Sequence, residues 1–141
     1  MRRWPLGLLA IATLLAGCAE HAQQRSSTRV YSVDFQGAAK LCKVPKSLSL
    51  DPGKPAETEI TVGNDGGWCA VTVAQSGGKP FDAGLVSTRP AHGKLLVHSV
   101  GDDTRIDYTP EAGFTGSDAY AVRLVPGQAV LSVKVTVTPK A

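Results

Sequence analysis

The most restrictive feature of this 141-residue sequence is a nearly regular alternation of apolar and polar side chains between residues 129 and 137. The residues that interrupt the apolar ones there include Ser132, Lys134 and Thr136. Successive side chains of a β-strand point to opposite faces, so a period of two predicts a strand with one buried face. The residues expected to face the core are Ala129, Leu131, Val133, Val135 and Val137.

Similar but shorter runs recur upstream, separated by clusters of glycine, proline, asparagine and aspartate. Regular spacing of short strands and turn signals is typical of a sandwich or barrel. Beyond residue 17 we find no helical period of useful length, so the sequence predicts an all-β fold of about seven or eight strands. The other predicted strands cover residues 47–50, 57–62, 68–74, 85–88, 94–100, 104–108 and 118–125.

The stretch YTPEAGFTGSDAY, residues 108–120, is predicted to be a turn that joins two strands. Pro110 ends the first strand because it lacks a ladder donor. Phe114 lies between two glycines, so we expect its ring to fold under the turn and close the open end of the sandwich. Asp118 is expected to accept hydrogen bonds from turn amides. Tyr120 starts the next strand, as the tyrosine of a tyrosine corner does, with its hydroxyl directed to upstream backbone.

The segments PAHGKLLV, IDYTPEAGFTGSDAYAVRL and VLSVKVTVTP together resemble the bacterial cadherin-like domain. The resemblance implies an immunoglobulin-like Greek-key β-sandwich over residues 41–139. It covers the second half of the domain, and residues 42–89 match only in strand count. The acidic motifs that bind calcium in true cadherins are absent, so no cofactor, no metal and no calcium-dependent adhesion is expected. The matching positions are Pro90, His92, Gly93, Tyr108, Pro110, Phe114, Gly116, Asp118 and Tyr120.

The first 17 residues are predicted to be a secretory signal peptide, with a positively charged start and an apolar run too short to span a bilayer permanently. The run ends in LLAGC, which resembles the lipobox of bacterial lipoproteins. The resemblance implies that Cys18 carries a diacylglyceryl group and an acyl chain such as palmitate. An ordinary signal peptide is the alternative. Ala19 is not aspartate, and the enterobacterial sorting pattern then implies the periplasmic face of the outer membrane.

The formal charge of the chain overstates how basic the mature protein is. Of 15 lysines and arginines, two precede the cleavage site, which leaves 13 basic residues against 12 acidic ones. No block of basic residues remains after processing, so neither nucleic acid nor an anionic lipid surface is an expected partner.

Three cysteines are present, and Cys18 is assigned to the lipid. Cys42 and Cys69 form an even pair in an oxidising compartment, which predicts a disulfide. In the chain-entropy model, a bond that closes the loop between residues 42 and 69 stabilises the folded state by about 3.5 kcal/mol. Metal binding is the alternative, but two isolated cysteines make a poor zinc site.

Residues 18–40 are predicted to form a flexible tether that carries the lipidated cysteine. Within it, residues 30–35 (VYSVDF) alternate, so they could form a short strand. This strand could dock on the domain, which we favour, or a partner could capture it by strand addition. Trp68 also allows two interpretations. Its ring packs against the core or the tether, or it forms an exposed binding patch.

No catalytic constellation stands out, and no nucleophile elbow is present. We therefore expect a non-enzymatic envelope lipoprotein, with a binding or structural module that engages another envelope protein or a glycan. A surface adhesin or an accessory subunit of a larger assembly is the alternative, because sandwich domains serve many roles. A small envelope hydrolase is a third hypothesis, and it would need distant carboxylates to converge, among them Asp82, Asp102, Asp103 and Asp118.

Overall fold

The computed structural model describes residues 30–140, which form nine strands and one short 3-10 helix. The predicted signal peptide and Cys18 lie outside the described residues, and their assignment stays a prediction. No helix within residues 30–140 is long and apolar enough to span a bilayer. The elements are η1 (Ser32–Phe35), β1 (Cys42–Lys43), β2 (Leu48–Leu50), β3 (Pro55–Gly63), β4 (Cys69–Gln75), β5 (Ala83–Thr88), β6 (Gly93–Val100), β7 (Asp103–Pro110), β8 (Gly116–Val125) and β9 (Ala129–Thr138).

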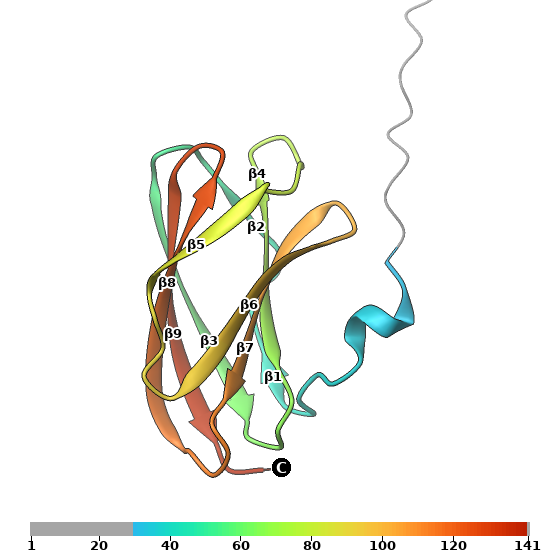
Figure 1. Ribbon diagram of the computed structural model, residues 1–141, viewed down its shortest axis with the longest axis vertical. Helices are drawn as coiled ribbons and strands as arrows, with labels where there is room; N and C mark the ends of the chain where they lie inside the picture. Colours follow the sequence, from blue (N-terminus) through green and yellow to red (C-terminus); the bar gives the residue numbers. More distant parts are fainter. Residues whose placement is uncertain (1–29, 141) are drawn as a thin grey trace, which may run out of the picture.

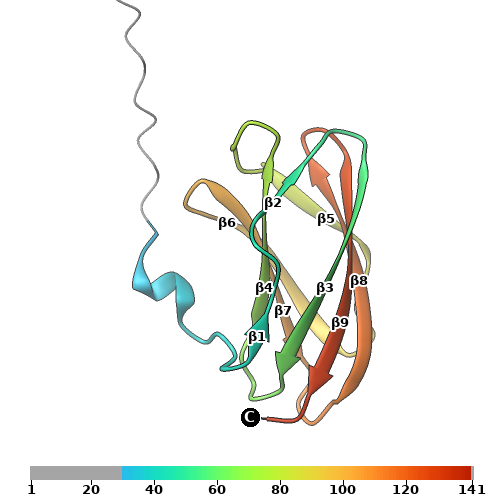
Figure 2. The same cartoon turned by 180° about the vertical axis from the view of Figure 1, so that it is seen from behind.

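The strands form two sheets that pack face to face, which confirms the predicted all-β sandwich (Figures 1 and 2). The five-stranded sheet has the order β1-β3-β9-β8-β5, and the four-stranded sheet has the order β2-β4-β7-β6. Most neighbours are antiparallel, but β3 runs parallel to β9 and β2 runs parallel to β4. The Greek-key connection and the immunoglobulin-type assignment stay predictions.

The core lies between the sheets and is filled by the alternating residues of each strand. All five apolar residues that the β9 pattern placed inward are buried, with exposed fractions of at most 3%. Residues of β2 and β3 belong to the same core, together with the inward-facing residues of β4, β7 and β8. These are Cys69, Val71 and Val73, then Ile106 and Tyr108, then Tyr120, Val122 and Leu124.

Residues 30–35 are not a strand, so this part of the sequence prediction is wrong. The structure has a 3-10 helix at Ser32–Phe35 instead. The Asp34 carboxylate accepts a hydrogen bond from the Tyr31 amide at 2.7 Å, and the Asp34 amide donates to the Tyr31 carbonyl at 2.9 Å. A local cap of this kind satisfies the backbone within the segment, which removes the need for a partner strand. The segment contacts its own domain through backbone carbonyl groups, as described below.

The predicted disulfide between Cys42 and Cys69 is confirmed, with a Cα–Cα distance of 5.3 Å. Cys42 belongs to β1 in the five-stranded sheet, and Cys69 belongs to β4 in the four-stranded sheet. The bond therefore joins the two sheets at the end where the chain enters the domain.

Candidate functional site

Asp118 holds together the end of the sandwich that contains the predicted turn motif. Its carboxylate accepts hydrogen bonds from the amides of Ala91 and His92, both at 2.9 Å, and from the Ala119 amide at 2.8 Å. The Tyr108 hydroxyl donates a fourth bond at 2.9 Å. Burial opposes ionisation of this carboxyl, but the four donors outweigh it and hold the pKa of Asp118 below its usual value. Asp118 thus binds turn amides as predicted. The amides of Ala91 and His92, however, belong to the preceding turn at residues 90–93 and not to the turn at residues 108–120.

The glycine of that preceding turn is required by close packing. A Cβ on Gly93 would lie 2.3 Å from the Tyr108 ring, which is fully buried. Phe114 is half-buried and packs against the core, and its ring stacks on His92 with centroids 4.1 Å apart. Asn64 fixes the loop from the other side, because its side-chain amide donates to the carbonyls of Glu111 and Phe114. The motif residues therefore build the fold, and no ligand-binding group emerges from them.

The tyrosine-corner prediction for Tyr120 is wrong. Its hydroxyl is buried and has no hydrogen-bond partner within residues 30–140, so it does not reach upstream backbone. Burial, with a smaller contribution from the negative charge of Asp107, raises the pKa of Tyr120. The tyrosine that makes the expected bond is Tyr108, whose hydroxyl also lies 3.3 Å from the His92 carbonyl. Which tyrosine hydroxyl has a hydrogen-bond partner therefore depends on the strand topology and not on the position of the tyrosine within the motif.

Trp68 takes part in a packed cluster on the outer face of the four-stranded sheet. The Arg105 guanidinium lies 4.1 Å from the centre of the Trp68 ring, a cation–π contact. Arg105 also donates two hydrogen bonds to Asp107, at 2.7 and 2.9 Å, and His98 lies 3.1 Å from the same carboxylate. Arg105 and Asp107 are 7% and 5% exposed, which is unusual for outward-facing charges.

The N-terminal segment, residues 30–39, covers this cluster. The Trp68 indole donates to the Gln36 carbonyl at 2.9 Å, and Arg105 donates to the Asp34 carbonyl. The Trp68 amide donates to the Gly37 carbonyl at 3.0 Å, and the Trp68 carbonyl accepts a hydrogen bond from the Ala39 amide at 2.8 Å. The Trp68 ring is therefore packed against its own chain and is not the free binding patch that one reading of the sequence allowed.

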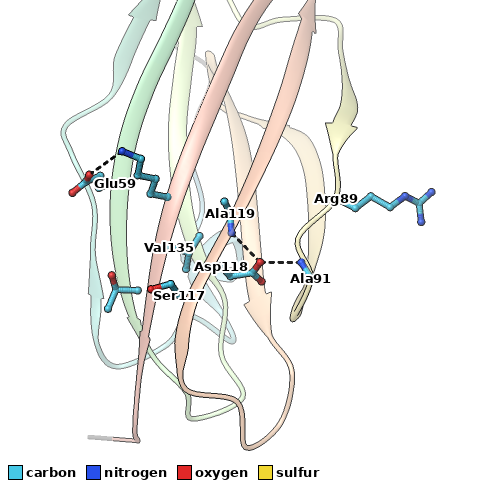
Figure 3. Close-up of a pocket in the computed structure, with 9 residues that line it drawn as sticks. Glu59, Arg89, Ala91, Ser117, Asp118, Ala119 and Val135 are labelled. Atoms are coloured by element: carbon cyan, nitrogen blue, oxygen red, sulfur yellow. Dashed lines mark hydrogen bonds and ion pairs between the residues drawn. The ribbon is translucent and has the colours of Figure 1, made fainter.

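A shallow groove of about 610 Å³ crosses the outer face of the five-stranded sheet (Figure 3). Arg89 extends away from the sheet at one side of it, and Glu59 lies at the other. Glu59 and Lys134 are 3.8 Å apart and both largely exposed, so their attraction is weak and both charges remain accessible. The lining residues are Glu59, Arg89, Ala91, Ser117, Asp118, Ala119, Lys134, Val135 and Thr136.

A second groove, of about 520 Å³, shares Arg89 with the first and lies where the edge strands β5 and β6 approach each other. Strand β5 pairs only with β8, and its register is irregular between Val86 and Thr88. Leu85 and Val86 on this strand are 58% and 40% exposed. We call the region formed by Leu85, Val86, Arg89, Lys94 and Leu95 the β5–β6 edge surface. An edge strand with exposed apolar side chains is a template for pairing with another chain. The short apolar run at residues 85–86 is only a weak signal for this surface.

The four carboxylates named for the hydrolase hypothesis do not all lie at one end of the sandwich. Asp118 lies at the start of β8, whereas the backbone amide of Asp82 donates to the Val125 carbonyl at the end of the same strand. Asp102 and Asp103 lie at the turn between β6 and β7, and Asp103 pairs with Val100. Within residues 30–140, no three histidine, cysteine, aspartate or glutamate residues are arranged to hold a metal ion.

What the described surface offers is a mixed polar groove beside an apolar strand edge. Such a surface can hydrogen-bond and pair with an extended partner. No protein-family model matches this chain, and no curated protein matches it either.

Proposed function

We propose that this chain is a lipid-anchored protein of the bacterial cell envelope whose immunoglobulin-like domain binds another envelope protein or a glycan without catalysing a reaction. The lipid on Cys18 holds the protein at the periplasmic face of the outer membrane. The domain then engages its partner through the β5–β6 edge surface. The observation that carries the proposal is the exposed, apolar and irregular edge strand β5, flanked by two grooves that meet at Arg89.

Strand addition suits this surface because backbone groups on the free side of β5 supply hydrogen bonds to an extended partner. Side-chain selectivity would come from the grooves, where Arg89 is exposed and makes no ion pair with any residue in the described range. Arg89 and Lys94 favour a partner segment that carries a carboxylate near its apolar residues.

The lipid anchor is tested by blocking the lipoprotein signal peptidase with globomycin. We expect a larger precursor to accumulate, and we expect the mass of the mature protein to include a diacylglyceryl group and an acyl chain on Cys18. An unchanged band together with an unmodified mature mass would refute the anchor.

The binding surface is tested by photo-crosslinking in cells from position 86. Glu57, an exposed residue on β3, is the matched control site. We expect one envelope component to be captured from position 86 and not from position 57. Changing Leu85 to lysine should remove the adduct without lowering Tm, because a charge on an edge strand disfavours pairing. Equal capture from both sites would rule out the edge as the binding surface.

Protease treatment of intact cells separates the periplasmic orientation from the surface-adhesin alternative. We expect the protein to survive, because a periplasmic domain is shielded by the outer membrane. Its loss from intact cells would place it on the outside.

A further inference from the structure

The N-terminal segment exposes four large apolar side chains within six residues. Val30, Tyr31, Val33 and Phe35 are 48%, 61%, 58% and 60% exposed. Soluble monomers seldom present such a contiguous apolar patch unless it contacts a partner or a membrane. The segment also contains one acidic residue, Asp34, whose carboxylate is occupied by the Tyr31 amide.

This patch is presented on a fixed support. Arg105 and the Trp68 indole both bind carbonyl groups of the segment, at Asp34 and Gln36. Arg105 is itself held by Asp107 and by the Trp68 ring. The backbone polar groups are thus directed to the domain, while the apolar side chains are left exposed to the solvent. Figures 1 and 2 show the segment on the outer side of the four-stranded sheet.

The position of the patch along the chain limits what can cover it. Val30 follows Cys18 by only about twelve residues, and a flexible linker of that length spans roughly 20 Å. A lipid on Cys18 would therefore keep the patch within roughly 40 Å of the bilayer surface even with those residues fully extended, and nearer on average. At that separation the effective concentration of bilayer near the patch exceeds that of a soluble partner.

We propose that residues 30–35 dock on the phospholipid bilayer and orient the domain against it. This inference rests on the proposed lipidation of Cys18. Valine and phenylalanine side chains would enter the boundary between headgroups and acyl chains, and the amphipathic ring of Tyr31 suits the same depth. The contact is apolar, so it does not need the basic block that the sequence lacks.

Docking in this way would turn the four-stranded sheet toward the membrane. The outer face of the five-stranded sheet, with Glu59 and Lys134, would then face away from the bilayer. The groove on that face would stay open to the periplasm.

The test uses the mature, lipidated protein in phosphatidylcholine vesicles. The photo-reactive amino acid p-benzoylphenylalanine replaces Tyr31 or Phe35, and Leu85 is the control because it is 58% exposed on the other sheet. After irradiation, adducts are identified by mass spectrometry. We expect at least ten times more phospholipid adducts from positions 31 and 35 than from position 85.

Equal phospholipid adducts at all three positions would overturn docking, because they would reflect proximity alone. Adducts from positions 31 and 35 to a second copy of the chain would overturn it in favour of self-association. The intact mass of the same sample reports the lipid on Cys18. A lipidated protein without the adduct pattern therefore refutes docking alone, whereas an unmodified Cys18 refutes the anchor and docking together.

Discussion

Replacing Asp118 with asparagine keeps the size of the side chain but removes one of two oxygens that each accept two hydrogen bonds. One oxygen serves the amides of Ala91 and Ala119, and the other serves the His92 amide and the Tyr108 hydroxyl. In either orientation, the new NH2 group faces two donors. A buried donor left unpaired costs about 1–3 kcal/mol, so we expect a loss of about 2–4 kcal/mol. For a domain of this size that is a fall in Tm of about 10–20 °C.

The assay is thermal unfolding of the wild type, Asp118→Asn and the exposed control Asp82→Asn, at pH values from 8 to 2. The control should stay within about 0.5 kcal/mol of the wild type at neutral pH. Because the folded-state pKa of Asp118 is lowered, its contribution is present above the unfolded pKa of about 3.9 and is lost as pH falls through the folded value. The gap between wild type and variant should therefore narrow below about pH 4. A gap under about 0.5 kcal/mol at pH 7, or one that keeps its size in acid, would refute the reasoning.

Four further changes test the packing, each measured by thermal or denaturant unfolding. Phe114→Ala should cost about 1–3 kcal/mol, less than for a fully buried ring, and an unchanged Tm would mean that the ring does not close the sandwich. Tyr120→Phe should be neutral or stabilising by up to about 2 kcal/mol, since it removes a buried hydroxyl without a partner, and a clear loss would reveal a missed bond. Arg105→Ala should cost about 3–5 kcal/mol, because the buried carboxylate of Asp107 loses its partner. It should also raise amide hydrogen exchange in residues 34–39, because the Asp34 carbonyl loses its donor, and unaltered exchange would show that Arg105 does not hold the segment. Cys42→Ala with Cys69→Ala should cost about 3.5 kcal/mol, and equal stability of the reduced and oxidised wild type would contradict this.

Strands such as β4, β8 and β9 could be predicted from the sequence because each has a buried face that imposes a period of two. The alternation at residues 129–137 and 104–108 places the same side chains inward as the structure does. Strand β1 was missed because two residues cannot show a period, and it exists only through its pairing with β3. Residues 30–35 show the opposite failure. Their alternation is real, but the Asp34 cap satisfies the local backbone, and no ladder forms.

The candidate site was harder to predict, because its contacts join segments that are distant in the sequence. In β7, the alternation alone would place Arg105 and Asp107 in solvent, opposite Ile106 and Tyr108. They are buried because the N-terminal segment covers them. The sequence around these two residues contains no pattern that predicts this burial. The role of Asp118 as an acceptor of amides was predictable, but its partners at residues 91 and 92 depend on how β5 and β6 connect.

The parallel pairing of β3 with β9 has a consequence for when the domain can fold. Pro55 pairs with Val130 and Gly63 with Thr138, so the central strand of the five-stranded sheet follows β1, β3, β5 and β8 along the chain. Without β9, β3 can pair with β1 and β8 can pair with β5, but the two pairs are not joined and the sheet remains in two pieces. Such non-local pairing makes folding slow compared with the closure of local hairpins. The five-stranded sheet can therefore form only after β9 has been synthesised.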